Sequence, residues 1–266
     1  MEILKKKKIG ILIISRSNSK RLKNKASLKI NNKSIIEILI SRLLKMYDRS
    51  SLVLCSSKTN NNKFFYKKIA KKYNINLFFG SELNVLERII SCSKKFKFNH
   101  IVRVTGDNPL IDIEAILPMC KDHLKKNYDY TFNNSLPRGT RPEVFSIKAL
   151  NKNYNQIIDL NSTEYLSFFF RRSDLYKVRK KNFRKIFKHQ NLFSASLDTK
   201  NDFEVLKKFL YENNNNKITK KKFFFYLKKR KKIKKEIKKI ILQTKKYDVR
   251  YQIDITKKRK DLTLVY

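Results

Sequence analysis

The sequence predicts an α/β protein with a doubly wound, mostly parallel β-sheet and helices on both faces of that sheet. Short apolar runs of strand length alternate with amphipathic helical patterns throughout residues 1–112. The apolar runs are continuous, which is typical of strands that helices bury on both sides. The 266-residue chain is 41% hydrophobic and includes 19 Phe and 13 Tyr, so it can fill a sizeable core.

The first 112 residues are expected to contain a regular succession of strands and helices. Strands are predicted at residues 9–14, 52–55, 77–79 and 101–104, and helices at residues 35–44, 64–73 and 85–90. Residues 15–33 are polar and basic and are expected to form a loop. Right-handed crossovers are the expected connection between parallel strands. A spatial order of third, second, first and fourth strand would make the first and the fourth neighbours.

After residue 112 the pattern becomes less regular. Helices are predicted at residues 113–124 and 201–211, and strands at residues 128–132, 143–147 and 193–197. Asn161 is followed three residues later by Glu164, which resembles an N-cap with its reciprocal acid and predicts a helix through residue 170. The four consecutive asparagines at 213–216 are expected to link residues 1–212 to a C-terminal extension.

The extension, residues 213–266, is strongly basic. Residues 217–260 hold 20 Lys and Arg against three acidic residues. Four isoleucines fall on one face of a helix, with lysines around the remainder. They are Ile233, Ile237, Ile240 and Ile241. We therefore expect a mainly helical extension that docks on the main domain through this apolar face.

The whole chain carries 64 Lys and Arg against 22 Asp and Glu, a net charge of +42 that excludes an ordinary near-neutral surface. One interpretation is mutational drift, because Lys, Asn, Ile, Phe and Tyr are the residues that an AT-rich coding sequence favours. The other is an anionic partner, either a phosphate-rich substrate or nucleic acid. The sequence shows no RRM, zinc-finger or KH pattern, which argues against specific nucleic-acid recognition.

Cysteine and histidine usage points to a reducing compartment and away from zinc chemistry. The three cysteines are widely spaced with no C-x-x-C pair, so we expect them to be small buried side chains. The three histidines lack the spacings of zinc hydrolases. No apolar stretch approaches the ~18 residues of a membrane-spanning helix, and the basic start lacks a cleavage-site pattern. We expect a cytoplasmic protein without membrane contact.

The loop after the first predicted strand is the most informative segment for function. It reads SRSNSKRLKNK and places Arg16, Lys20, Arg21 and Lys25 just beyond the carboxyl end of that strand. Open α/β sheets bind nucleotides at this edge, and four cations on one short loop can hold a triphosphate. A solvated surface loop is the alternative, because basic residues are frequent throughout this chain.

A second segment, VRVTGDNPLID, ends the fourth predicted strand and contains Asp107. If the first and fourth strands are neighbours, Asp107 faces the basic loop. Mg²⁺ binds one or two carboxylates together with substrate phosphates and water, so this juxtaposition fits metal-dependent phosphoryl chemistry. The alternative is a turn residue, since Gly-Asp-Asn-Pro is also favourable turn chemistry.

Five segments in order across residues 9–211 resemble the motifs of one enzyme family. They read SRSNSKRLKNK, FGSELNVLERI, VRVTGDNPLID, LPRGTRPEVFS and SASLDTKNDFEVL. The chain resembles the cytidylyltransferases that activate acidic and surface-polysaccharide sugars. The most similar subgroup is named for spore-coat polysaccharide biosynthesis and is itself similar to the acylneuraminate and 3-deoxy-manno-octulosonate cytidylyltransferases.

This resemblance implies a glycosyltransferase-A-like fold, with residues 1–212 as the nucleotidyltransferase domain. It implies a Mg²⁺-dependent transfer of CMP from CTP to a sugar hydroxyl, with release of pyrophosphate. Dimers are common in the family, so a homodimer is a further expectation. A related nucleotidyltransferase that uses another NTP or a sugar phosphate, a basic nucleic-acid-binding protein and a degenerate non-catalytic homologue are the alternatives.

The resemblance also implies roles for individual residues by their match to the motifs. Arg16, Ser19, Arg21 and Lys25 match the nucleotide and phosphate loop. Asp107 and Asp198 match carboxylates that bind Mg²⁺. Arg88, Arg103, Arg138 and Glu143 match residues expected at the rim of the sugar and nucleotide pocket. Arg21 and Lys25 would hold the departing phosphates, so these two and Asp107 are the expected catalytic residues.

The sequence departs from the family pattern at several positions. Asn18 stands where the family has Gly, and Lys23 with Asn24 replaces a Pro-Gly pair, which predicts a less rigid loop. Arg141 occupies a position that is often Asp, and Tyr165 one that is often His. The last two departures leave the identity of the acceptor sugar open, and no histidine stands out as a general base.

Overall fold

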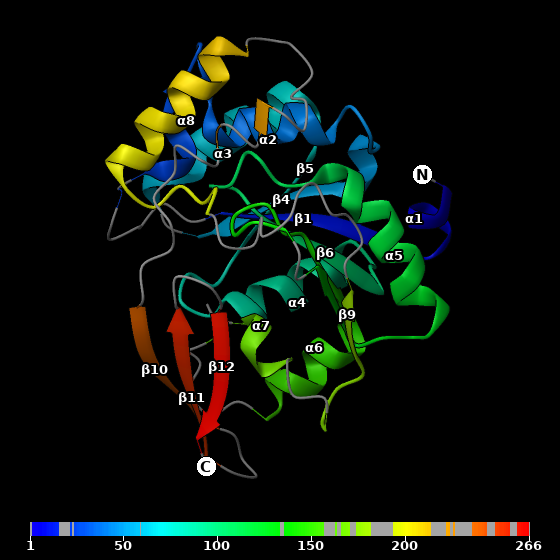
Figure 1. Ribbon diagram of the computed structural model, residues 1–266. Coiled ribbons are helices and arrows are strands. Elements are labelled where there is room, and N and C mark those ends of the chain that lie inside the picture. The colour runs from blue at the N-terminus through cyan, green and yellow to red at the C-terminus, as the bar shows by residue number, and fades with distance from the viewer. Residues whose placement is uncertain are drawn as a thin grey trace.

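The computed structural model describes residues 2–15, 22, 24–58, 60–133, 136–156, 163, 166–170, 174–181, 194–213, 222–223, 226, 236–243, 248–255 and 260–265. Its centre is a seven-stranded sheet in the order β5-β4-β1-β6-β8-β7-β9 (Figure 1). The strands are β1 (Ile9–Ser15), β4 (Leu52–Ser57), β5 (Asn76–Gly80), β6 (His100–Thr105), β7 (Tyr130–Asn133), β8 (Glu143–Ser146) and β9 (Val178–Lys181).

The sheet is mostly parallel, as predicted. Strands β5, β4, β1 and β6 pair in parallel, and they are the four predicted strands in the predicted spatial order. Only β8 runs against its neighbours, because it pairs antiparallel with both β6 and β7, whereas β7 and β9 are parallel. The order places β1 at the centre of the sheet, between β4 and β6.

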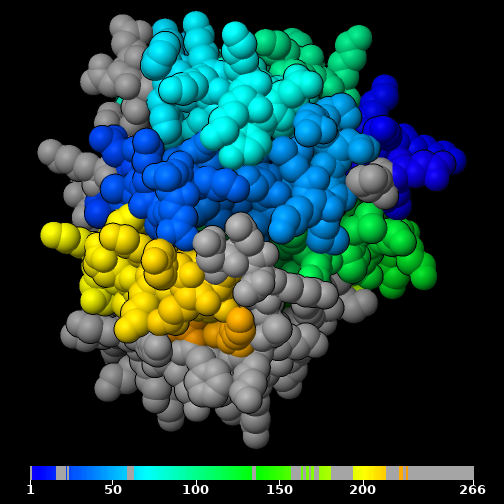
Figure 2. All heavy atoms as spheres, turned by 90° about the horizontal axis from the view of Figure 1, so that it is seen from above, coloured from blue at the N-terminus to red at the C-terminus, as the bar shows by residue number. Residues whose placement is uncertain are grey.

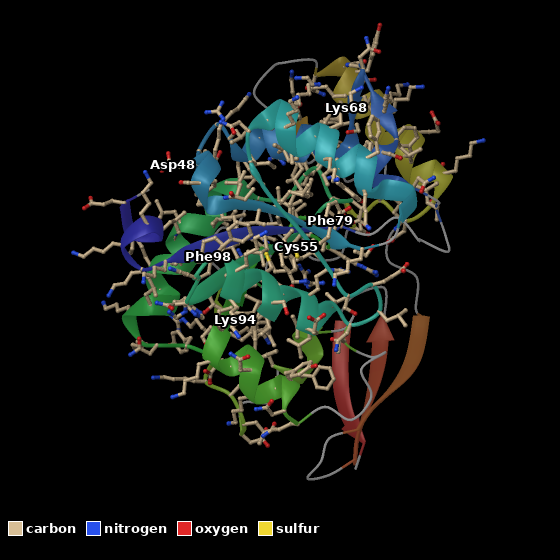
Figure 3. All side chains as sticks on the ribbon, turned by 180° about the vertical axis from the view of Figure 1, so that it is seen from behind. Asp48, Cys55, Lys68, Phe79, Lys94 and Phe98 are labelled. Carbon is tan, nitrogen blue, oxygen red and sulfur yellow. The ribbon has the colours of Figure 1, made fainter. Side chains whose placement is uncertain are left out.

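Helices cover both faces of this sheet, which confirms the predicted layers. Helices α2 (Ile35–Leu43), α3 (Asn60–Tyr73) and α5 (Ile116–Lys125) pack on one face, and α4 (Val85–Lys95), α6 (Ile147–Tyr154) and α7 (Leu166–Phe169) pack on the other (Figure 1). Figure 3 shows this through its labels, with Lys68 of α3 and Lys94 of α4 on opposite sides of Cys55.

The continuous apolar run of β1 is explained by this double cover. Ile11 and Ile13 pack into the core under α2, α3 and α5, whereas Leu12 and Ile14 pack into the core under α4 and α6. All four side chains are buried, since successive residues of a strand point to opposite faces.

The ends of α2 show how local sequence fixes a helix. Ser34 caps its start, and the Glu37 carboxylate accepts hydrogen bonds from the Ser34 backbone N–H at 2.8 Å and the Ser34 hydroxyl at 2.7 Å. Lys72 of α3 donates to the other Glu37 oxygen at 2.7 Å. The capping box therefore also ties α2 to its neighbour α3.

Asparagine takes over positions where glycine is usual, in a chain with only four Gly. Residues Asn24, Asn31, Asn32, Asn74 and Asn127 have positive φ. The pair Asn31 and Asn32, with φ of 49° and 61°, forms the two-residue turn between the short strands β2 (Lys29–Ile30) and β3 (Lys33–Ser34). Positive φ at both central residues matches the right-handed twist of a hairpin.

A third, smaller core lies where α8 (Lys200–Glu212) packs beside α2 and the β2-β3 hairpin. Leu206 and Phe209 of α8 are buried together with Ile30 and Ile35. In Figure 2 the yellow residues of α8 lie beside the blue residues of this region. The end of α8 coincides with the predicted end of the main domain, but that domain boundary stays a prediction.

Shorter elements complete the described chain. They are α1 (Glu2–Lys6) and the 3-10 turns η1 (Lys25–Ser27), η2 (Arg49–Ser51) and η3 (Ile113–Ala115). The sequence analysis did not predict α1, which buries Leu4. No helix within the described ranges is long and apolar enough to cross a membrane.

The strand predicted at residues 193–197 is wrong over its described residues. Residues 194–197 form no strand apart from a single bridge between Ser194 and Arg138, because their neighbour is a loop and not a sheet edge. Asn161 and Glu164, the predicted cap, lie outside the described residues, and the helix that follows is the short α7.

The prediction of a mainly helical extension is also wrong over its described residues. Its described residues form a separate antiparallel sheet of β10 (Glu236–Gln243), β11 (Asp248–Ile255) and β12 (Lys260–Val265) (Figure 1). Hydrophobic residues alternate along β11 with period two, which favours a strand. A helix would also bring lysines of equal charge together at i,i+4 spacing. Ile237, Ile240 and Ile241 therefore belong to a strand, and Ile233 lies outside the described residues.

The centre of the sheet yields a stability prediction at Gly10 in β1. A Cβ atom added there would lie 2.3 Å from the ring of Phe98, which is labelled in Figure 3. We expect Gly10→Ala to lower the free energy of unfolding by ~1–3 kcal/mol through overpacking. Chemical denaturation of Gly10→Ala, Phe98→Ala and the double variant measures it. The double variant should be more stable than additivity predicts, and strict additivity would contradict this contact.

Candidate active site

Three predicted site residues meet at the carboxyl edge of the central sheet. Lys25 begins η1 after the β1 loop, Asp107 follows β6, and Asp198 precedes α8. The Lys25 ammonium nitrogen lies 2.9 Å from Asp198 Oδ1 and 3.7 Å from Asp107 Oδ2. The Lys25 side chain is only 7% exposed, so the two carboxylates share one nearly buried cation.

The pairing of β1 with β6 brings these segments together. The two strands are parallel neighbours, with Ile14 opposite Thr105, so both chains leave the sheet at the same edge. The Gly106 N–H donates to the Ile14 carbonyl at 2.8 Å and holds together the two segments that leave β1 and β6. Open α/β sheets bind ligands at such a point.

The loop that carries Asp107 is fixed by contacts of its own. Asn108 Nδ2 donates to Asp107 Oδ1 at 3.2 Å and to the Thr105 hydroxyl at 2.5 Å. Arg42 of α2 donates to the Pro109 carbonyl, and burial lowers the pKa of Arg42 to about 10. The guanidinium stays charged at neutral pH, so the Asp107 loop is anchored on α2.

Asp198 is held by the first turn of α8. The Asp202 carboxylate accepts from the backbone N–H of Asp198 at 3.0 Å and of Thr199 at 2.8 Å, and Thr199 Oγ1 accepts from the Asp202 N–H. Ser196 donates its hydroxyl to Asp198 Oδ2 at 2.9 Å. Asp202 and Ser196 lie within the last of the five motifs, and no role was predicted for them from the sequence. The Thr-x-x-Asp spacing of a capping box could have identified Asp202.

Arg138 lies in the loop between β7 and β8 and approaches the same carboxylate. Its guanidinium lies 3.9 Å from Asp198 Oδ2 and is partly exposed. The next residue, Gly139, has φ of +83°, and a Cβ there would lie 2.4 Å from the Ser196 nitrogen. The Ala195 N–H donates to the Arg138 carbonyl at 2.8 Å. Glycine at 139 thus permits the close approach of two backbones that brings Arg138 to Asp198.

The two carboxylates differ in their electrostatics. Burial raises the pKa of Asp107, the negative charge of Asp198 acts in the same direction, and Lys25 opposes both. Burial would also raise the pKa of Asp198, but Lys25, Arg138 and Ser196 hold it at about 2. A second cation near both groups would lower the pKa of Asp107, because opposite charge favours the ionised carboxylate.

This donor set fits a hard divalent cation. Carboxylate oxygens are the ligands that Mg²⁺ prefers, and one or two of them suffice when phosphates and water complete the shell. Within the described part of the chain, no cluster of three or more His, Cys, Asp or Glu side chains could hold a metal by protein ligands alone. Asp107 and Asp198 therefore suit an ion that arrives with a phosphate-bearing substrate.

Arg103 and Glu143 form a second cluster on the sheet. They are register partners on β6 and β8, and Arg103 Nη1 lies 2.5 Å from Glu143 Oε2. The Tyr130 hydroxyl donates to Glu143 Oε1 at 2.5 Å. The side chains of Arg103 and Glu143 are each 15% exposed, so the pair is mostly buried. Their role in substrate binding stays a prediction.

Arg88 lies beneath the surface of α4, and its expected place at the rim of the substrate pocket stays a prediction. Its side chain in α4 is fully buried, and its guanidinium donates to the Ser81 carbonyl at 2.7 Å. A buried arginine that binds a backbone carbonyl supports the loop between β5 and α4 from beneath. Sequence matching identified the residue, but the direction of its side chain depends on how α4 packs on the sheet.

The other residues singled out in the sequence are those of the basic loop and those that depart from the family pattern. Arg16, Ser19, Lys20 and Arg21 lie outside the described residues, as do Asn18 and Tyr165. Asn24 has φ of 52°, a conformation that Gly or Asn adopts most readily, so its replacement of glycine preserves the backbone. Arg141 donates to the Leu136 carbonyl at 2.6 Å and thus has a structural contact within its own loop.

Comparison with known proteins identifies the family. Residues 10–258 match the family model described as Cytidylyltransferase. The spore coat polysaccharide biosynthesis protein SpsF of Bacillus subtilis is 27% identical over 205 residues, which cover 75% of this chain and 85% of the relative.

Solved structures show the same fold. A cytidylyltransferase from Leptospira borgpetersenii superposes with a TM-score of 0.73 at 24% identity, covering 84% of this chain and 98% of that one. CMP:2-keto-3-deoxy-manno-octonic acid synthetase in complex with CTP superposes with a TM-score of 0.59 at 11% identity, covering 77% of this chain and 99% of that one.

The contact at Gly139 yields a prediction about the site. We expect Gly139→Ala to lower the free energy of unfolding by ~1–3 kcal/mol, because it adds strain at positive φ and a clash with the Ser196 backbone. It should also reduce enzymatic turnover, since it separates Arg138 from Asp198. Asn127→Ala is the matched control, because Asn127 has φ of 49° but is exposed in the turn between α5 and β7, at the amino end of that strand. Melting curves and turnover should show a stability loss in both variants and a turnover loss only in Gly139→Ala.

Proposed function

Because the chain belongs to the cytidylyltransferase family, we propose that it transfers CMP from CTP to a hydroxyl of an acidic or surface-polysaccharide sugar and releases pyrophosphate. The observation that carries this proposal is the contact of Lys25 with both Asp107 and Asp198 at the carboxyl edge of the sheet. The name of the Bacillus subtilis relative and the CTP complex of the structural neighbour support the choice of sugar class and nucleotide.

The proposed chemistry follows from the charges at this edge. The sugar hydroxyl attacks the α-phosphorus of CTP in line with the departing pyrophosphate, and negative charge grows on the phosphate oxygens. Lys25 and Arg138 provide cations beside the carboxylate pair, and Arg21 is proposed to act with Lys25 on the β- and γ-phosphates. Asp107 and Asp198 would hold Mg²⁺, which supplies a Lewis acid for the α-phosphoryl group when bound.

The acceptor side of the site is proposed around Arg103 and Glu143. Glu143 accepts hydrogen bonds from Arg103 and Tyr130, so its carboxylate is held in one orientation. A carboxylate fixed in this way can accept a hydrogen bond from a sugar hydroxyl, and the Arg103 guanidinium can pair with an acidic sugar. Family resemblance supports both roles.

The described histidines are poorly placed to act as the general base. His100 begins β6, whereas Asp107 follows the end of that strand. His100 Nδ1 lies 3.2 Å from His123 Nε2, and His123 Nδ1 lies 2.8 Å from the Thr131 hydroxyl. Burial lowers the pKa of His123 to about 3, with the neighbouring His100 acting in the same direction. The pair therefore forms a neutral hydrogen-bonded network at the amino edge of the sheet.

A cytoplasmic location and a homodimer belong to the same proposal and rest on composition and family resemblance. Recognition of nucleic acid is not part of it, although the net charge of +42 gives non-specific attraction at low salt.

The nucleotide is tested by measuring pyrophosphate release and melting temperature with CTP, UTP, ATP and GTP, each combined with Mg²⁺ and a panel of acidic sugars. CTP should give the largest stabilisation, which mass action sets at about 2.7 kcal/mol for a ligand at 100 times its Kd. Turnover should require both CTP and a sugar. Equal shifts with all four nucleotides would mean that the triphosphate is bound and cytosine is not read.

The carboxylates are tested by Asp107→Asn and Asp198→Asn. Each should keep the fold and lower turnover by ~100-fold or more, as loss of a group that stabilises transition-state charge typically does. Glu204→Gln is the matched control, because it removes an exposed carboxylate of α8 and should leave turnover unchanged. Wild-type pyrophosphate release by Asp107→Asn would show that the assignment of this carboxylate is wrong.

A further inference from the structure

Lys25 contacts one oxygen of each carboxylate in the proposed metal site. Its ammonium lies 3.7 Å from Asp107 Oδ2 and 2.9 Å from Asp198 Oδ1. The other oxygen of each carboxylate has a different partner, since Asp107 Oδ1 accepts from Asn108 and Asp198 Oδ2 accepts from Ser196. The oxygens that both carboxylates turn toward one shared cation are therefore the two that Lys25 contacts.

We propose that Lys25 is an internal counter-ion that competes with the divalent cation for Asp107 and Asp198, so that the metal binds together with the nucleotide and not before it. This inference rests on the proposed function, because it takes the carboxylate pair as the metal site. It assigns to Lys25 a role in the protein without nucleotide, in addition to its proposed contact with the departing phosphates.

The charge balance supports competition. Two carboxylates with one ammonium carry a net charge of −1, whereas the pair without Lys25 carries −2 and attracts a divalent cation more strongly. The two cations also need the same lone pairs, because an ammonium and a metal ion cannot occupy one position between the same oxygens. Arg138 does not replace Lys25, since it lies 3.9 Å from Oδ2 of Asp198, whereas Lys25 contacts Oδ1.

The burial of Lys25 explains why it would leave the two carboxylates only when the nucleotide is bound. Lys25 is 7% exposed, so moving it away from both carboxylates leaves a nearly buried ammonium without a counter-ion, which is strongly unfavourable. The triphosphate of the proposed substrate gives Lys25 a new anionic partner. Lysine suits such an exchange because its ammonium sits on a flexible four-carbon chain. Metal and nucleotide should therefore bind cooperatively.

The test measures binding and not turnover. Binding of Mn²⁺, an ion that carboxylate and water ligands also suit, is followed by electron paramagnetic resonance on the full chain without nucleotide. Binding of CTP is followed by calorimetry in EDTA. Lys25→Met should bind Mn²⁺ at least about tenfold tighter than wild type and CTP at least about tenfold weaker, within the range typical of coupled sites. These opposite changes distinguish a counter-ion from a merely structural residue, whose loss weakens both.

Mn²⁺ and CTP binding are measured in the same way for two control variants. Lys25→Arg keeps the charge and should bind Mn²⁺ as weakly as wild type. Lys29→Met removes an exposed cation a few residues away and should also resemble wild type, which excludes an effect of net charge alone. If Lys25→Met shows no cooperative melting, Lys25→Gln replaces it in both titrations.

The outcomes separate this inference from the proposed function. The double variant Asp107→Asn, Asp198→Asn should lose Mn²⁺ binding. If it does, and Lys25→Met binds Mn²⁺ no tighter than wild type, the counter-ion role is overturned while the metal site stands. If the double variant binds Mn²⁺ as wild type does, the metal assignment and this inference both fail.

Discussion

The parallel pairing of β1 with β6 sets the geometry of the candidate site, because both strands end at the same edge of the sheet. The segment that leads to Lys25 follows one strand, and Asp107 follows the other. Burial on both faces keeps this pairing in register, since Ile11, Ile13 and Val102 pack under one layer of helices and Leu12 and Ile101 under the other. A one-residue slip would exchange the two faces and separate the loops.

Asp198 reaches this edge from much later in the chain, so its position depends on a different set of contacts. The capping box of α8 fixes its backbone, and the close approach at Gly139 fixes the segment before it. α8 in turn packs on Ile30 of β2 and on Ile35, the first residue of α2, and both follow Lys25 closely in the chain. The same small core thus holds the backbones on both sides of the ion pair between Lys25 and Asp198.

Asparagine compensates for the scarcity of glycine at several left-handed backbone positions. Asparagine occupies left-handed positions at Asn24, Asn31 and Asn32, where its short polar side chain tolerates positive φ better than most residues do. Among the described lysines, by contrast, Lys25 is the one that is buried, and it lies against two carboxylates. Position in the fold therefore separates this lysine from the many others that contribute to the net charge of +42.

The sequence by itself determined the layered α/β fold and the order of its four central strands, because continuous apolar runs and helical periodicity are local properties of burial. Motif order also identified Lys25, Asp107, Asp198 and Arg138 before their contacts were known. Tertiary structure decided what periodicity cannot express. It buried Arg88 beneath a loop, paired Arg103 with Glu143 and joined Asp202 to the backbone of Asp198. Residues 236–243 form a strand because they pair with β11. Repulsion between lysines weakens the alternative helix. Side-chain direction and strand pairing depend on partners distant in sequence, and only the folded chain brings those partners together.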